Sequence, residues 1–390
     1  MVMILQLLNC NYEMLNPAIV AGENCFVIDE AGRRYLDFEA GVWCASLGHN
    51  NRRVNAAIIG QMNAISHVGY RYSTKIVAEA AEKVLGLVGF PEGKCVFLSS
   101  GSEAVEFGVR LAKKAIDRPY YLCLKDYFLS SYGTSATRGR EGWISLDLSE
   151  YSGDADVFLR DVPFDKTAAF VFEPGNASGT VKLPPKDLIR AIEKRVKASG
   201  GVIAVDEITT GTGRTGKWFG FEHYDIRPDI VSIGKGIGNG YPVSVVAISP
   251  QLSALAEQSG FKYAQSHQND PLGCAVVNEV ISVIEHDGMI QRASDMGTVL
   301  ASELCALLGR HASIQAVRGV GLMYVMEFRR AEGFPLETIH RALFDAGYIA
   351  GVNVPANLLR FYPPLTIEEA HIRRMADALN TVLLQYGSIS

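Results

Sequence analysis

The chain of 390 residues lacks the cysteine patterns that would point to a disulfide framework or a metal centre. Its seven cysteines stand singly, an odd number with neither a C-x-x-C pair nor the spacing of metal ligands. Single cysteines are typical of reduced thiols, so we expect a cytoplasmic protein and no bound metal. The seven residues are Cys10, Cys25, Cys44, Cys95, Cys123, Cys274 and Cys305.

Long hydrophobic runs and blocks of like charge are also absent. The apolar start Met1 to Leu8 lacks a basic flank and is too short to cross a bilayer, so we expect neither a signal peptide nor a membrane anchor. The 37 basic and 42 acidic side chains are spread along the chain, so neither nucleic acid nor a membrane surface is an expected partner. A hydrophobic content of 48% instead supports at least one large core.

The middle of the chain contains short β-rich runs that alternate with helical patterns. This alternation is typical of an α/β fold in which helices cover a parallel sheet. Apolar residues at helical spacing predict one helix over Pro185 to Ser199, between the third and fourth predicted strands. The predicted strands are Cys95 to Leu98, Tyr120 to Leu124, Ala168 to Phe172, Val202 to Val205, Ile230 to Ile233 and Val243 to Ile248.

The two ends of the chain have a different pattern. Cys25 to Phe38 is predicted to form a β-hairpin with its turn at Asp29 to Gly32. Further strands are predicted at Gly321 to Phe328 and Leu358 to Phe361, among helices. We therefore expect a second, smaller domain assembled from both chain ends.

Lys235 ends the apolar run Asp229 to Ile233 and stands among glycines at positions 234, 236, 238 and 240. Glycines let a flat ligand approach the backbone. A lysine removed from water has its charged form disfavoured, so its amine becomes a nucleophile able to form a Schiff base. The pattern favours covalent chemistry with a cofactor. A strand that ends in a surface lysine and a glycine turn explains the segment alone equally well.

A second motif, SSGSEA at residues 99–104, follows a predicted strand and opens a helix predicted over Ala104 to Ala115. Unpaired amide groups and the positive end of the helix dipole converge there, and both favour a bound phosphate. An ordinary helix start with Ser102 as the capping residue is the alternative. Ligands of parallel sheets lie outside the carboxyl ends of the strands, where this turn is expected, and that position favours the phosphate.

A third motif is the apolar run Gly201 to Val205, which ends in the carboxylates Asp206 and Glu207. A buried carboxylate is costly unless it has a positive partner. In a cofactor site that partner could be a protonated ring nitrogen. A helix cap or a structural salt bridge with Arg214 explains the run equally well.

The three motifs together offer a phosphate cradle, an anion for a ring cation and an amine for an aldehyde, which are the complements of pyridoxal 5'-phosphate. On these residues the chain resembles the class III aminotransferases, a fold type I family that uses this cofactor. The resemblance extends from GRRYLDF at residues 32–38 and LGH at 47–49 to RFYPPL at 360–365. It is most specific at DEITTGTGRTG, residues 206–216, which is followed by PDI at 228–230 and by Lys235.

The resemblance implies an α/β architecture of fold type I, with a mostly parallel seven-stranded sheet between helices. It implies a large cofactor-binding domain at residues 52–280, and a small α+β domain at residues 1–51 and 281–390. It also implies a homodimer with shared active sites.

The resemblance further assigns roles to individual residues. Lys235 would form the Schiff base with pyridoxal 5'-phosphate, and Asp206 would pair with the pyridine nitrogen of the cofactor. Gly101 and Ser102 would bind the phosphate. Tyr127 stands where the family has an aromatic residue over the cofactor ring, a stacking contact that suits a flat π-system.

Three more residues match the family by position. Ser266 stands where the family has a threonine that reaches the phosphate of the neighbouring subunit. Arg360 matches an arginine that clamps a substrate carboxylate through a planar two-pronged contact. Trp43 aligns with a stretch that lines the substrate pocket, and a buried core tryptophan is the alternative.

The chain also departs from the family pattern. Ser178 replaces the second glutamate of the run E-P-x-x-x-E, which shields the carboxylate-binding arginine, so Arg360 is expected to be unpaired and open to an α-carboxylate. Phe128 and Leu129 replace a histidine and a glycine, and Thr209 stands where a glutamine often lies near the ring hydroxyl. These departures predict a specialised substrate.

The resemblance predicts an enzyme that moves an amino group from an amine or amino acid to a 2-oxo acid by a ping-pong mechanism. An amino acid racemase, an epimerase or an aminomutase on the same scaffold is the alternative, since these enzymes keep the same lysine, aspartate and phosphate cradle. A non-catalytic binding protein is disfavoured because Lys235 and Asp206 are both retained.

Overall fold

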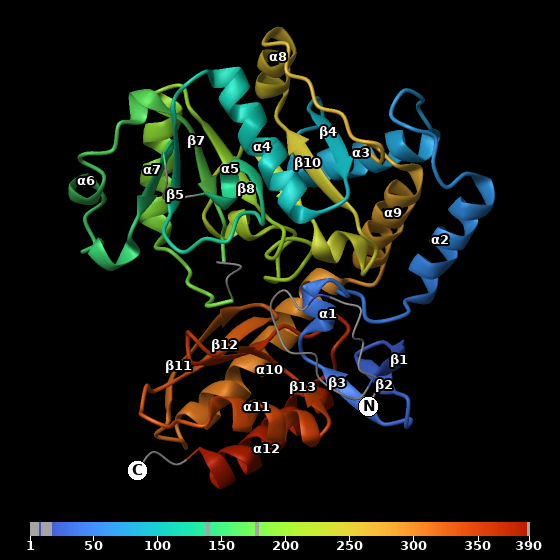
Figure 1. The fold of residues 1–390 in the computed structure, drawn as a ribbon, viewed down its shortest axis with the longest axis vertical. Helices are drawn as coiled ribbons and strands as arrows, with labels where there is room; N and C mark the ends of the chain where they lie inside the picture. Colours follow the sequence, from blue (N-terminus) through green and yellow to red (C-terminus); the bar gives the residue numbers. More distant parts are fainter. Residues whose placement is uncertain (1–7, 9–17, 138–140, 176–178, 388–390) are drawn as a thin grey trace.

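The computed structural model describes residues 8, 18–137, 141–175 and 179–387. A seven-stranded sheet in the order β4-β10-β9-β8-β7-β5-β6 forms the centre of the upper, larger part of the molecule (Figure 1). Strands β9, β8, β7, β5 and β6 run parallel, and β10 is antiparallel to both of its neighbours. The prediction of a mostly parallel seven-stranded sheet is confirmed. The strands are β4 (Lys94–Leu98), β5 (Tyr120–Leu124), β6 (Trp143–Leu146), β7 (Thr167–Phe172), β8 (Val202–Asp206), β9 (Ile230–Ile233) and β10 (Ser244–Ile248).

Continuous apolar runs form the centre of this sheet. Strands β7, β8, β9 and β10 are buried along their whole length, which is the pattern of strands covered on both faces. All six predicted strands are present. Strand β6 was not predicted because it lies at the sheet edge, where only its first and last residues are buried and no apolar run marks it.

Helices pack against the sheet in the pattern that the sequence predicts. The helix predicted over Pro185 to Ser199 is α7 (Lys186–Ala198), which packs against β7 and β8. The helix predicted from Ala104 is α4 (Gly101–Ile116), which begins three residues earlier. The other helices of this part are α2 (Arg52–Ala64), α3 (Lys75–Val88), α5 (Gly133–Ala136), α6 (Ala155–Phe158), α8 (Pro250–Gln258) and α9 (Pro271–His286).

The lower part of the molecule combines both chain ends, with the blue N-terminal strands beside the orange and red C-terminal elements (Figure 1). The predicted hairpin is β2 (Phe26–Asp29) with β3 (Arg34–Asp37), in a sheet of order β1-β2-β3-β13. A second sheet has the order β11-β12-β15-β14. The remaining elements are β1 (Ile19–Glu23), α1 (Ala40–Trp43), α10 (Met289–Leu308), β11 (Ile314–Val320), β12 (Met323–Phe328), α11 (Leu336–Asp345), β13 (Tyr348–Ile349), β14 (Gly351–Asn353), β15 (Leu358–Phe361) and α12 (Glu369–Tyr386).

One hydrophobic core joins the two chain ends. Leu36 and Phe38 are buried in the same cluster as Leu300 and Phe361, on elements far apart in the sequence. Strand β3 also pairs in parallel with β13, which ties the N-terminal hairpin to the C-terminal segment. The division into a large domain at 52–280 and a small one at 1–51 and 281–390 stays a prediction. In the described part of the chain, no helix is long and apolar enough to cross a membrane.

Candidate active site

The carboxyl ends of three strands of the central sheet bring the three sequence motifs together. Strand β8 ends at Asp206, strand β9 leads through Gly234 to Lys235, and strand β4 leads into the start of α4 at Gly101. Gly234 and Gly101 are packed so closely that a Cβ on Gly234 would lie 3.5 Å from the Cα of Gly101 and 2.9 Å from Ile208 Cδ1. The expected edge of the sheet therefore holds a lysine, an aspartate and a helix N-terminus side by side.

Lys235 points its amine into the interior rather than to the surface. It starts a short 3₁₀ helix, η4 (Lys235–Gly238), with a left-handed φ of 45°, which is a strained conformation for a residue other than glycine. Its Nζ donates to Thr209 Oγ1 at 3.0 Å. Burial lowers the pKa of Lys235, and the neighbouring Asp206 opposes that shift. The hydrogen bond directs the amine, and burial disfavours its charged form.

Asp206 and Glu207 have different surroundings because successive strand residues face opposite sides of the sheet. Asp206 is buried, and its Oδ1 accepts one hydrogen bond, from the Ile208 amide at 3.0 Å. Burial raises the pKa of Asp206 to about 6, against the lowering effects of the Ile208 amide and of Lys235. A desolvated carboxylate with so few donors is suited to a cationic ligand.

Glu207 is a structural residue. Its carboxylate accepts hydrogen bonds from Thr210 Oγ1 at 2.6 Å and from the amides of Gly220 and Phe221 at 2.8 and 2.7 Å. The alternative of a salt bridge from this run to Arg214 is wrong, because the Nη1 of Arg214 donates instead to the carbonyl oxygens of Leu322 and Pro363.

The start of α4 differs in detail from the expected cap. Ser100, and not Ser102, caps the helix, with its Oγ accepting from the Glu103 amide at 3.2 Å. Glu103 in turn accepts from the Ser99 amide at 2.9 Å. Ser102 lies in the first turn and its Oγ accepts from the Ser131 amide at 3.0 Å, so the alternative of Ser102 as the cap is wrong.

Tyr127 lies close to this group and is fully buried. Its ring centroid is 6.4 Å from that of Phe172, at the end of β7. The Tyr127 hydroxyl has no hydrogen-bond partner among the described residues, although such buried hydroxyls are normally satisfied. Burial raises the pKa of Tyr127 well above its usual value, with Asp206 among the smaller causes.

Trp43 and Arg360 extend the site toward the lower part of the molecule. The Trp43 ring centroid lies 4.8 Å from Lys235 Nζ and 5.2 Å from Arg360 Cζ, within the range of cation–π contacts. Trp43 is also buried and packs against Tyr362 with ring centroids 5.0 Å apart. It is thus a core residue that touches both cations.

Arg360 is not unpaired, which corrects the expectation drawn from Ser178. Its Nη2 is 3.3 Å from Oε2 of Glu39, and its Nε is 3.4 Å from Oε1. Glu39 immediately precedes α1, 321 positions away in sequence, so nothing in the local pattern could indicate this contact. The only signal was a carboxylate in the otherwise apolar run after Asp37. Ser178 itself lies outside the described residues.

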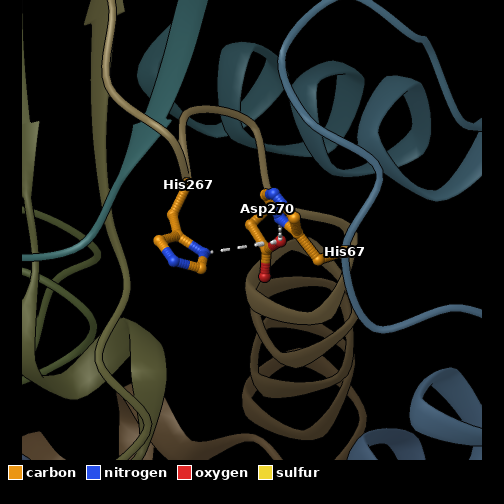
Figure 2. Close-up of side chains that lie close together, drawn as sticks. All are labelled: His67, His267 and Asp270. Atoms are coloured by element: carbon orange, nitrogen blue, oxygen red, sulfur yellow. Dashed lines mark hydrogen bonds and ion pairs between the residues drawn. The ribbon is translucent and has the colours of Figure 1, made fainter.

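Ser266 is not part of this group in the single chain. It is exposed, in the turn that precedes α9. In the same turn His267 Nδ1 lies 4.0 Å from Asp270 Oδ1, while His67 Nδ1 lies 2.8 Å from the same oxygen (Figure 2). Histidine and aspartate are residue types that bind zinc. Here, however, the one short contact, between His67 and Asp270, is a hydrogen bond, and both histidines are exposed. We interpret them as a link that fixes the segment before α3 to the start of α9.

The fold is shared with solved structures of transaminases. An S-selective transaminase from Arthrobacter sp. with alanine bound has the same fold, with a TM-score of 0.88 and 24% identity over 97% of this chain and 95% of that chain. An acetylornithine aminotransferase from Elizabethkingia anophelis superposes with a TM-score of 0.85 at 24% identity, over 96% of each chain.

The class III aminotransferase family model matches residues 8–122 and 156–383, and the chain belongs to this family. An acetylornithine aminotransferase of Methanosarcina mazei is 30% identical over 368 residues, 92% of this chain and 89% of that protein. A [LysW]-aminoadipate semialdehyde/glutamate semialdehyde transaminase of Sulfurisphaera tokodaii is 28% identical over 381 residues, 94% and 95% of the two chains. The predicted family is confirmed, and the enzyme is an aminotransferase.

Proposed function

We propose that this aminotransferase holds pyridoxal 5'-phosphate at the ends of β8 and β9 and moves an amino group from an amine or amino acid to a 2-oxo acid. The observation that carries the proposal is the meeting of the Lys235 amine, the buried Asp206 carboxylate and the N-terminus of α4 at one edge of the sheet. Three chemically different groups there match the three parts of one cofactor.

The residues present fit this cofactor. Asp206 would pair with its ring nitrogen, because the carboxylate is desolvated and has a single amide donor on Oδ1. Gly101 and Ser102 would hold its phosphate at the first turn of α4, where amide groups lack partners within the helix. Tyr127 would lie beside the ring, and among the described residues its buried hydroxyl has no hydrogen-bond partner. When bound, the cofactor supplies an aldehyde for amines and a ring system that accepts electron density.

Lys235 is proposed to be the catalytic base as well as the anchor. Its Nζ would hold the cofactor until a substrate amine binds. The freed Nζ would then accept a proton from the reacting carbon of the substrate and would later give that proton back. Burial lowers the pKa of Lys235, which favours this role, and the hydrogen bond to Thr209 directs the amine.

The substrate end of the site is proposed to lie between Trp43 and Arg360. A planar guanidinium in a buried position is suited to a carboxylate of an amino acid or 2-oxo acid. The relatives are named for acetylornithine and for LysW-bound aminoadipate and glutamate semialdehydes. We propose an amino-group donor and a 2-oxo acid acceptor for this chain, without assigning it the substrate of one relative.

The active form is proposed to be a cytoplasmic homodimer in which Ser266 reaches the cofactor phosphate of the neighbouring subunit. The support is that Ser266 is exposed on the single chain, where it is available to a partner. All cysteines in the described residues are free, which suits a reducing compartment. Ser266→Ala should weaken cofactor retention, whereas a fully active monomer would contradict the shared site.

A panel of amines and amino acids, each incubated with pyruvate or 2-oxoglutarate, tests the proposed reaction. The purified protein should show an absorbance band near the visible edge, and nitrogen should appear in alanine or glutamate. Conversion of one enantiomer of a donor into the other, without any acceptor, would point to racemisation instead. A wild-type protein that shows no such band after incubation with the cofactor would contradict cofactor binding.

A further inference from the structure

The carboxylate of Glu39 pairs with the guanidinium of Arg360, the group that is proposed to bind the substrate carboxylate. Both side chains are nearly buried, with 11% of Glu39 and 12% of Arg360 exposed. Their two contacts measure 3.3 and 3.4 Å, longer than the 2.7–2.9 Å range that is usual for charge-assisted hydrogen bonds. The remaining side-chain contact of Glu39, from Trp43 Nε1, is also 3.4 Å long. Glu39 is therefore paired, but none of its contacts has close geometry.

The backbone that carries Glu39 is strained. Ala40, Gly41, Val42 and Trp43 follow it with φ angles of 45°, 56°, 56° and 70°, a left-handed turn that contains three residues with side chains. Such a conformation costs roughly 1–2 kcal/mol for each residue other than glycine. Asp37 holds the base of the turn by accepting from the amides of Glu39 and Gly41 at 2.7 and 2.9 Å.

The same turn connects the two ends of the proposed site. Glu39 stands at the start of the turn and pairs with Arg360. Trp43 stands at its end, with its ring centroid 4.8 Å from Lys235 Nζ. A rearrangement that moves Glu39 away from Arg360 would also move the ring that lies against Lys235. Strain of this kind is typical of segments that rearrange when a ligand binds.

Two glycines leave room around the pair. A Cβ on Gly351 would overlap the Glu39 carboxylate and come within 2.5 Å of Arg360 Nε. A Cβ on Gly179 would lie 2.6 Å from Arg360 Nη1. The guanidinium thus lies among backbone atoms, and the described residues place one carboxylate, that of Glu39, against it.

We propose that Glu39 is an exchangeable counter-ion of Arg360. A substrate with a carboxylate near its reacting carbon displaces Glu39 and takes its place on the guanidinium. A substrate that carries no such carboxylate leaves Glu39 in place, so that the buried guanidinium stays neutralised. Glu39 thereby lets one site accept both kinds of substrate in the two halves of the reaction, and this inference rests on the proposed function.

The charge of Glu39 has opposite effects on the two kinds of substrate. For a carboxylate substrate it is a competitor, so its removal should strengthen binding. For an amine without a carboxylate it is a requirement, because an unpaired guanidinium would otherwise face an apolar group at a high desolvation cost. If Glu39 were only structural, its removal would instead lower the activity with both kinds of substrate, through loss of folded protein.

The test is Glu39→Gln in the full-length protein loaded with cofactor, since glutamine keeps the shape and removes the charge. We expect the KM for pyruvate to fall about fivefold or more, and the kcat/KM for a carboxylate-free amine such as 1-phenylethylamine to fall by a similar factor. The dissociation constant of pyruvate for the cofactor-loaded protein, measured by calorimetry, should fall in parallel. The melting temperature verifies that the variant is folded.

Glu327→Gln is a matched control, since Glu327 forms a partly buried ion pair with Arg318 between β11 and β12. It should change neither the KM for pyruvate nor the kcat/KM for 1-phenylethylamine. Equal changes for both kinds of substrate in Glu39→Gln, or none, would overturn the exchange. If the wild-type protein transfers no amino group at all, the proposed function fails, and the pyruvate titration still decides whether Glu39 competes for Arg360.

Discussion

The carboxyl edge of the central sheet and the turn Glu39–Trp43 both supply side chains to one site, but they differ in how the fold positions those side chains. At the sheet edge, Asp206 is the last residue of the buried strand β8 and Lys235 follows the buried strand β9, and the pairing of β8 with β9 brings them together. At the turn, Glu39 meets Arg360 across 321 positions of sequence through a strained backbone. In our proposals the first region carries the chemistry on a rigid frame, and the second provides a contact that a substrate can replace.

Lys235→Ala would break the sheet-edge region most severely. Without Nζ there is neither an anchor for the cofactor nor a base, so amino transfer should fall at least about 10³-fold. The absorbance band of the bound cofactor should shift or disappear at the same time. Lys262→Ala serves as the control, since Lys262 is exposed in the segment after α8 and should retain full activity. Activity near the wild-type level in Lys235→Ala would remove the basis of the proposed mechanism.

Asp206→Asn tests the second member of the same edge. The substitution keeps the size of the side chain and loses its charge, so a cationic ring nitrogen would lose its partner and transfer should fall about 10²-fold or more. Cofactor retention should weaken as well, as measured by the rate at which the band is lost on dialysis. The folded protein should lose little stability, because burial already disfavours the charged form of Asp206. A variant with unchanged kinetics would assign Asp206 a structural role.

Glu207→Ala tests whether Glu207, unlike its neighbour Asp206, serves to stabilise the fold. Glu207 satisfies the Thr210 hydroxyl and two backbone amides in a buried position, so its loss leaves three donors without a partner. We expect the free energy of unfolding in urea to fall by roughly 3 kcal/mol. Glu79→Ala, which removes an exposed partner of Lys75 on α3, should change it by less than about 0.5 kcal/mol. A stable but inactive Glu207 variant would mean that Glu207 belongs to the catalytic group.

The two regions also differed in how far the sequence could predict them. Buried apolar strands followed by Asp206 and Lys235 form a local pattern, and the rule that ligands lie at strand ends placed both residues in one site. The alternative reading of the motif at residues 99–104 named Ser102 as the cap of α4, whereas Ser100 caps the helix, because closely spaced serines offer equivalent caps in sequence. The expectation of an unpaired Arg360 was wrong because the pairing depends on how the chain ends pack, and no periodicity encodes it.

Val42→Gly examines the strain of the turn with the smallest expected effect. Val42 is exposed, at 61%, so its side chain contributes little packing, while its φ of 56° disfavours a β-branched residue. Glycine adopts this conformation without steric cost, although it adds entropy to the unfolded chain. The net result should be a rise of about 0.5–1 kcal/mol in the free energy of unfolding, measured in urea.

Val354→Gly is the matched control for this substitution. Val354 is also exposed but has no positive φ, so glycine there should lower the free energy of unfolding by about 0.5 kcal/mol. A fall of similar size in Val42→Gly would show that the turn is not strained. A rise, in contrast, would mean that the segment bearing Glu39 stores energy in the paired state. A relaxed turn should then also release Glu39 less readily, which would appear as a higher KM for pyruvate.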